Sequence, residues 1–134
     1  MTRPVQVCSD AAPSPTGAYS QAIVADGWCF VSGQVGWRSP EEGLEGRDVE
    51  QQTRQALENI DLVLSAVGAS LRDVVRTTVY LQDIGDFRAF NKAYEETMTD
   101  HGVETFPART TVGTAIRVAV EIEAIAAVPG TAGS

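Results

Sequence analysis

The alternating run VAVEIEAIAA, residues 118–127, constrains the fold more than any other part of the sequence. In an extended chain, successive side chains point to opposite faces. One face would carry Val118, Val120, Ile122, Ala124 and Ala126, and the other Ala119, Glu121, Glu123, Ile125 and Ala127. This pattern predicts a strand with a dry face that needs a cover. Its mixed face places two carboxylates in polar or functional surroundings.

Three strands are predicted before the first helix, at 5–8, 19–24 and 28–34, and one after it at 74–81. Asp26-Gly27 indicates a two-residue hairpin turn, and Gly33 within a strand indicates a close backbone approach. The expected faces group Trp28 with Phe30, Ser32 and Gln34, and Val75 with Thr77, Val79 and Leu81. The segment from Arg38 to Gly46 is expected to be a polar loop.

Two amphipathic helices are predicted. Asp48, with Gln51 three residues later, indicates a capping box at the start of the first helix, and Gly68 indicates its end. The second helix is capped by Asp83 or Asp86 and runs to about Met98. Its apolar stripe is Phe87, Phe90, Tyr94 and Met98.

Two helices can cover one face of a mixed sheet, but not both. The other face would carry Glu121 and Glu123 among too many apolar groups to face water alone. We therefore expect an α+β fold, a mixed sheet with two helices packed on one face, whose second face is covered by other copies of the chain in a closed oligomer.

Length and charge restrict the function. The 134 residues indicate one domain, with a core at about 5–128 and a flexible tail at 129–134. The net charge is −8 and Lys92 is the only lysine, so a nucleic-acid partner is not expected. No secretory signal and no apolar run near the ~18 residues of a membrane helix is present. We expect a cytoplasmic protein without a membrane partner, in which Cys8 and Cys29 are reduced, small apolar residues.

No cofactor or metal motif stands out. His101 follows the second helix and is expected to be a surface residue at its C-terminus. No cluster of His, Cys and carboxylates has metal-ligand spacing, and neither a Ser/His/Asp arrangement nor a glycine-rich phosphate loop is visible.

Six motifs, in order and spanning nearly the whole chain, resemble the YjgF/RidA family. They are GAYSQAI at 17–23, VSGQV at 31–35, RTTVYLQD at 76–83, FNKAYE at 90–95, FPAR at 106–109 and VEIEAIA at 120–126. The resemblance implies a single domain with a chorismate-mutase-like fold, a homotrimer and ligand clefts between subunits. It also implies hydrolysis of reactive 2-imino or enamine acids to 2-oxo acids and ammonia, without metal or cofactor.

The resemblance also assigns site residues. Arg109 matches the family's substrate-carboxylate arginine and Glu121 its site glutamate. Further positions in or beside the cleft are Tyr19, Ser32, Gly33, Asn91, Tyr94 and Thr111. This chain departs from the family at Ala18, commonly proline, at Thr111, often cysteine, and at Trp37, commonly small or proline. The link from Arg109 to Glu121 is also short. These departures concern substrate size and leave the carboxylate grip in place.

Each assignment has an alternative. Arg109 suits bidentate carboxylate binding, but could form a structural ion pair with a strand glutamate. Glu121 could move protons for an attacking water, or serve as an interfacial ion-pair partner; Glu123 is expected to be structural, paired with Arg117 or Arg76. Two rival functions remain: a non-catalytic trimer that binds small carboxylic acids, and the RNA cleavage reported for some family members, against which the acidic composition and single histidine count.

Overall fold

The computed structural model describes residues 3–39, 42–44, 46 and 48–130. Its elements in chain order are β1 (Val5–Val7), β2 (Ala22–Ala25), β3 (Trp28–Val35), β4 (Trp37–Ser39), β5 (Gly43–Leu44), α1 (Val49–Ser65), the 3₁₀ turn η1 (Leu71–Asp73), β6 (Val74–Leu81), the 3₁₀ turn η2 (Ile84–Asp86), α2 (Phe87–Asp100), β7 (Ala108–Gly113) and β8 (Val120–Ala127). The predicted tail at 129–134 lies mostly outside the described residues.

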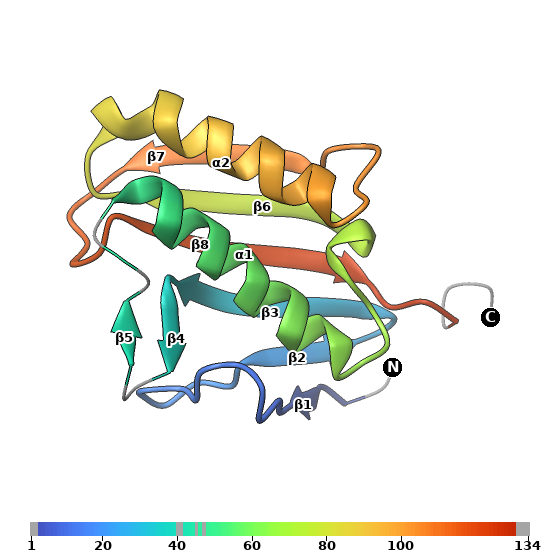
Figure 1. The fold of residues 1–134 in the computed structure, drawn as a ribbon. Helices are drawn as coiled ribbons and strands as arrows, with labels where there is room; N and C mark the ends of the chain where they lie inside the picture. The colour runs from blue at the N-terminus through green and yellow to red at the C-terminus, as the bar shows by residue number, and fades with distance from the viewer. Residues whose placement is uncertain (1–2, 40–41, 45, 47, 131–134) are drawn as a thin grey trace.

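Six strands form one mixed sheet in the order β1-β2-β3-β8-β6-β7. All neighbouring pairs are antiparallel except β6 and β7, which run parallel and are joined through α2. Both helices lie on the same face of the sheet (Figure 1). The predicted arrangement, two helices on one face of a mixed sheet, is therefore confirmed.

The strand ending the chain has the predicted faces. Val120, Ile122, Ala124 and Ala126 are buried beneath the helices, whereas the alternate side chains are only partly covered. The core is completed from the helices by Leu57, Ile60, Leu64, Phe90 and Met98. Each such large apolar side chain stabilises the fold by about 1.5–3 kcal/mol relative to exposure.

The turns and caps largely follow the predicted chemistry. Asp26 and Gly27 have φ values of 52° and 82° between β2 and β3, as a two-residue hairpin of this kind requires. The Asp48 carboxylate accepts a hydrogen bond from the Gln51 amide at 2.7 Å, and Gly68 has φ 73° just beyond α1. The Asp48 N-cap is therefore confirmed. The Gln51 side chain lies against Gly46 instead of bonding back to the Asp48 amide, so the predicted capping box is wrong.

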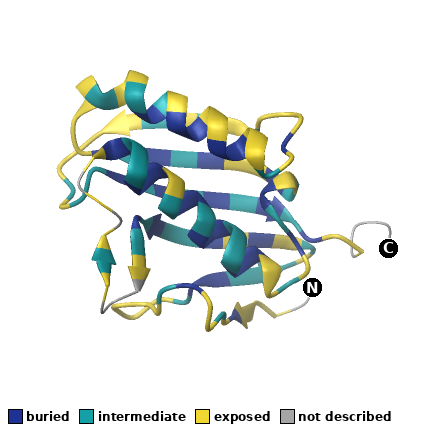
Figure 2. Ribbon diagram, in the orientation of Figure 1, coloured by how far each residue is buried: buried dark blue, intermediate teal, exposed yellow. Residues whose placement is uncertain are grey.

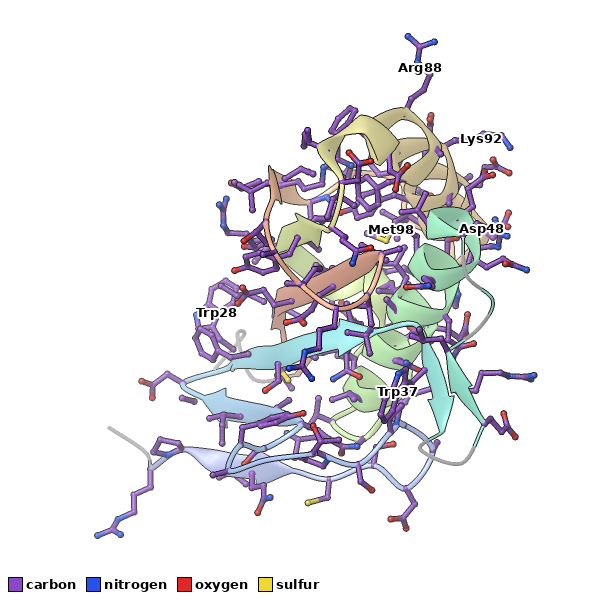
Figure 3. All side chains as sticks on the ribbon, turned by 90° about the vertical axis from the view of Figure 1, so that its left-hand side faces the viewer. Trp28, Trp37, Asp48, Arg88, Lys92 and Met98 are labelled. Carbon is purple, nitrogen blue, oxygen red and sulfur yellow. The ribbon has the colours of Figure 1, made fainter. Side chains whose placement is uncertain are left out.

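The sheet face away from the helices is open in this single chain. Trp28 and Phe30 are 42% and 45% exposed there, and Figure 3 shows Trp28 pointing away from the helices. Figure 2 shows that the residues of β6 and β8, in the middle of the sheet, are mostly buried or intermediate. Exposed aromatic side chains on a sheet face are typical of an interaction surface.

Two strands depart from simple alternation. A register shift between Val31 and Gln34 places Gln34 opposite Ile122, so Gln34 is buried on the helix side and the predicted grouping with Trp28 is wrong. A second shift between Val74 and Arg76 leaves Val75 exposed while Val74 is buried. Such bulges insert a residue and reverse the faces beyond them, which strict alternation cannot anticipate.

Two predicted boundaries are also corrected. β2 begins at Ala22, because the Tyr19 amide bonds the Gly17 carbonyl at 2.9 Å and folds this part into a loop. Within the expected loop at 38–46, the described residues include the short hairpin β4–β5. Among the described residues, neither helix is long and apolar enough to cross a membrane.

Candidate active site

All of the predicted site residues except Thr111 line one of two separate hollows. The first, of about 490 Å³, contains Glu121, Tyr19, Ser32 and Gly33, and we call it the Glu121 hollow. Its other lining residues are Pro13, Ser14, Pro15, Thr16, Gln21, Gln34, Val35 and Trp37. The second, the Arg109 hollow, has about 420 Å³ and is lined by Asn91, Tyr94, Glu95, Phe106, Pro107 and Arg109.

Glu121 lies directly against the backbone of Gly33. A Cβ atom at position 33 would lie 2.8 Å from the carboxyl carbon of Glu121 and closer still to its Oε2. The close approach predicted for Gly33 is thus made by the glutamate itself. Any larger residue would displace the carboxylate from its place on β8.

The Glu121 carboxyl group is poised to exchange a proton. Partial burial, and then the neighbouring charge of Glu123, raise the pKa of Glu121 above its ordinary value. No hydrogen bond to this carboxylate is formed by the described residues. A carboxyl group that lacks a partner and has a raised pKa in a hollow is a candidate general acid or base.

Glu123 has a different partner from those expected. Its Oε1 accepts a 2.6 Å hydrogen bond from the Tyr80 hydroxyl, and this bond raises the pKa of Tyr80. Arg76 instead donates to the Thr110 hydroxyl at 2.6 Å. This bond agrees with the predicted structural role of Glu123. Its partner Tyr80, which directly opposes Glu121 on β6, was not predicted from the sequence.

The wall of the Glu121 hollow is held by a buried amide. Gln21 is 5% exposed; its Oε1 accepts from the Ser9 amide at 2.6 Å and its Nε2 donates to the Pro13 carbonyl at 2.9 Å. Ser32 donates its hydroxyl to the Ser20 carbonyl at 2.6 Å, which leaves its oxygen able only to accept from a ligand. Tyr19 is exposed and its hydroxyl lies 3.2 Å from the Thr16 amide nitrogen, which donates to it.

Arg109 rests on an aromatic platform. Its guanidinium carbon lies 5.6, 5.2 and 4.8 Å from the ring centroids of Phe87, Phe90 and Tyr94 on α2. Each cation–π contact of this kind contributes roughly 0.5–2 kcal/mol and orients the planar group. In the described part of the chain, no carboxylate lies within 4.0 Å of Arg109, so the alternative of a structural ion pair finds no support within this protomer.

The other predicted site residues near Arg109 differ in their exposure to solvent. Tyr94 is buried and its hydroxyl pairs with Thr77 at 2.8 Å, so it supports Arg109 through its ring. Burial raises the pKa of Tyr94. Asn91 is partly exposed beside Arg109 in the hollow. Thr111 follows two residues later on β7 and is not among the lining residues of either hollow.

The two charged residues face opposite sides of the sheet. Arg109 is level with Thr77, on the helix side, whereas Glu121 is level with Tyr80, on the open side. β7 is also the edge strand, and β6 separates it from β8. One small molecule cannot touch both groups within one chain.

One cluster was not foreseen from sequence. His101 lies 2.9 Å from a Glu58 oxygen through Nε2 and 3.8 Å from an Asp61 oxygen through Nδ1. These three residues could in principle hold a cation, but the two ring nitrogens address different carboxylates. The cluster therefore ties the end of α2 to α1, and His101 is partly buried and paired rather than a free surface residue.

Comparison with known proteins agrees with this architecture. Residues 9–128 match the family model described as Endoribonuclease L-PSP. The chain is 42% identical to a RutC family protein of Pyrococcus horikoshii and 38% identical to a 2-iminobutanoate/2-iminopropanoate deaminase of Salmonella typhimurium, each over 123 residues that span 90% of this chain and 94% of the relative. The solved structure of E. coli TdcF with bound serine superposes with a TM-score of 0.85 at 33% identity, covering 92% of this chain and 98% of that one.

The matched region contains both hollows and all the strands from β2 to β8. The expected chorismate-mutase-like fold is confirmed with it. The extent of the match and the level of identity leave one assignment: the chain belongs to the YjgF/RidA family, which the Endoribonuclease L-PSP model describes.

Proposed function

We propose that this protein hydrolyses reactive 2-imino acids, and their enamine tautomers, to 2-oxo acids and ammonia. The observation that carries the proposal is the pair of charged groups described above. Glu121 and Arg109 each border a hollow, and neither has an oppositely charged partner among the described residues. The name of the Salmonella relative and the serine bound by TdcF support a small amino- or imino-acid ligand.

The active site is proposed to form between copies of the chain. Arg109 lies on the edge strand and faces the helix side, away from the Glu121 hollow of its own chain. We therefore propose that it meets the substrate held in the Glu121 hollow of a neighbour. Because Trp28 and Phe30 are exposed on the open face, we expect that another protomer covers this face. A homotrimer, with each cleft built from two protomers, satisfies both requirements.

In the proposed reaction, Arg109 holds the substrate carboxylate by two parallel hydrogen bonds. Bulk water first protonates the imine nitrogen. A water molecule then attacks the imine carbon while Glu121 accepts one of its protons, and Glu121 returns that proton to the amine nitrogen of the tetrahedral intermediate. The C–N bond breaks, ammonia leaves with the bonding electrons, and the hydroxyl releases its proton to bulk water as the 2-oxo group forms.

The other residues position these groups in the proposal. Gly33 leaves room for the Glu121 carboxylate, and the Ser32 oxygen can accept from the substrate nitrogen. Tyr19 and Asn91 border the substrate from the two hollows, while Tyr94 orients Arg109 through its ring. Thr111 is proposed to border the cleft from the edge strand. No step requires a metal or cofactor.

A coupled assay tests the proposal. An amino acid oxidase generates 2-imino acids in place, catalase removes peroxide, and semicarbazide traps imine that survives. The protein is expected to reduce trapped imine well below the spontaneous rate of loss, and Arg109→Ala is expected to abolish that effect while Arg88→Ala keeps it. Arg88 is exposed on α2 and points away from the body of the molecule (Figure 3).

The two rival functions make different predictions in the same experiments. A non-catalytic carboxylate-binding trimer would bind 2-oxo acids through Arg109 without accelerating imine loss. An RNA-cleaving protein would degrade RNA with no dependence on Arg109. Unchanged imine lifetimes with a purified, assembled protein would therefore overturn the deaminase proposal.

A further inference from the structure

The Glu121 hollow has an apolar wall that the proposed hydrolysis does not need. Trp37, Pro13, Pro15 and Val35 contribute to it, and the ring of Tyr19 also lines the hollow. Among the lining residues, Glu121 is the only acid, and no lysine or arginine is present. Polar residues such as Ser14, Thr16 and Gln34 line the rest of the hollow, and the apolar wall offers a surface that suits an uncharged side chain.

Trp37 is fixed in this wall by a buried network. Asn59, 1% exposed, donates to the carbonyl oxygens of Val35 at 3.0 Å and of Trp37 at 2.8 Å. Gln55 donates in turn to the Asn59 oxygen at 2.9 Å. The two carbonyls flanking Gly36 are thus tied to α1, so the indole is carried on a backbone with little freedom to move.

Gly36 adds a second constraint. A Cβ atom at position 36 would lie 2.7 Å from the Cα of Gln52 on α1. The backbone at Gly36 therefore contacts the helix directly. On the opposite wall, Gln21 holds the Pro13 carbonyl at 2.9 Å. Both sides of the hollow are arranged before a ligand arrives, which favours selectivity because less ordering is needed on binding.

The volume leaves room for a large ligand. A water molecule occupies about 30 Å³ in the liquid, so the hollow has space for many water-sized groups and can admit a side chain larger than a methyl group. The hollow measures about 490 Å³, although part of the substrate would extend toward Arg109.

We propose that the apolar wall around Trp37 is the subsite for the substrate side chain, and that it selects 2-imino acids with branched or aromatic side chains over three- and four-carbon ones. The proposal rests on the proposed deaminase function. Acidic side chains are excluded because they would meet Glu121 at close range. Trp37 acts as a specificity-determining residue and Asn59 as the residue that positions it.

The test compares imino acids made from alanine, leucine, phenylalanine and glutamate, with each rate corrected for spontaneous hydrolysis. Wild-type kcat/KM is expected to be at least tenfold higher for the phenylalanine product than for the alanine product, and lowest for the glutamate product. Trp37→Ala is expected to lower the phenylalanine-to-alanine ratio about tenfold, and Trp37→Phe to preserve most of it.

Ile84→Ala is the matched control. It truncates an exposed apolar side chain on η2, outside both hollows, and is expected to leave the ratio within twofold. A wild-type preference for the alanine product, or a ratio that Trp37→Ala does not change, would overturn the inference and leave the deaminase proposal intact.

Calorimetry with stable 2-oxo acids separates the inference from the proposed function. Phenylpyruvate is expected to bind at least tenfold more tightly than pyruvate to wild type, and this difference is expected to disappear in Trp37→Ala. If no imino acid is hydrolysed but this binding pattern holds, the deaminase proposal fails and the subsite remains. Equal binding of both acids by wild type would reject the subsite.

Discussion

The two hollows hold opposite charges in opposite ways. Glu121 has a carboxylate pressed against Gly33, partly desolvated and without a hydrogen-bond donor among the described residues. Arg109 has a cation spread over three aromatic rings. The first environment disfavours the charge that it contains, whereas the second stabilises its charge without neutralising it.

This difference indicates a division of labour. A carboxylate whose pKa is raised takes and returns a proton more readily than an ordinary glutamate, because its protonated form is less costly. A guanidinium stays charged at every accessible pH and serves to bind. Substitution of Glu121 itself should therefore act mainly on kcat, and substitution of Arg109 mainly on substrate binding.

The largest effect on kcat is expected for Glu121→Gln. Glutamine preserves the shape but cannot exchange a proton, so kcat should fall by roughly 10²–10⁴, the usual contribution of a positioned acid or base. Binding of a 2-oxo acid should stay within a few-fold of wild type, and the exposed Glu104→Gln is the control. An assembled variant with wild-type kcat would remove Glu121 from the mechanism.

Arg109→Ala is expected to weaken substrate binding. Loss of a charge-assisted bond of about 1.5–3 kcal/mol corresponds to a roughly 10- to 150-fold lower kcat/KM per bond. With two such bonds, turnover should become undetectable. Arg109→Lys should recover little, because an ammonium group lacks the planar fork. Near-wild-type kcat/KM in the lysine variant would show that Arg109 does not bind the substrate carboxylate through two parallel hydrogen bonds.

The aromatic platform should have a smaller effect. Tyr94→Phe keeps the ring beneath Arg109 and loses the hydrogen bond to Thr77, whereas Tyr94→Leu loses the ring as well. A cation–π contact of roughly 0.5–2 kcal/mol predicts a several-fold higher KM for the leucine variant than for the phenylalanine variant. Equal KM values in the two variants would mean that the ring does not orient Arg109.

The smallest effect concerns stability and pH. Because the pKa of Glu121 is raised above its ordinary 4.5 in the fold, its contribution to stability is full below that value and declines as pH rises through the folded pKa. Glu121→Gln removes this decline. The Tm of the variant relative to wild type should therefore increase between about pH 4 and pH 8, as scanning calorimetry would measure. If the Tm of the variant relative to wild type decreases over this pH range, the pKa of Glu121 is not raised by folding.

Much of the fold was predictable because local chemistry determined it. The alternation in β8, the Asp26-Gly27 turn and the Asp48 cap each depend on a few neighbouring residues. The bulges near Gly33 and Val75 were not predictable, because the register of a strand depends on its partners. The β4–β5 hairpin was not predicted because its two strands are too short to show an alternating pattern.

The candidate site residues were assigned only through family resemblance, and the contacts that hold them could not be predicted from the sequence. Phe87, Phe90 and Tyr94 form the expected helical stripe, but nothing in their spacing shows that Arg109, from a distant strand, packs on them. The bond between Tyr80 and Glu123 and the anchoring of Trp37 by Asn59 likewise join residues more than twenty positions apart. Such contacts follow from the sheet order rather than from any local pattern.

Mixed oligomers test the central claim, that each active site joins Glu121 of one protomer to Arg109 of another. Arg109→Ala and Glu121→Gln chains, each inactive alone, are unfolded together in equal amounts and refolded. In a ring of identical interfaces, random assembly places two intact residues together in about a quarter of the clefts. If the clefts are shared between protomers, imine hydrolysis is expected at about a quarter of the wild-type rate. Activity no higher than that of either variant alone would show that the two residues do not act together across an interface.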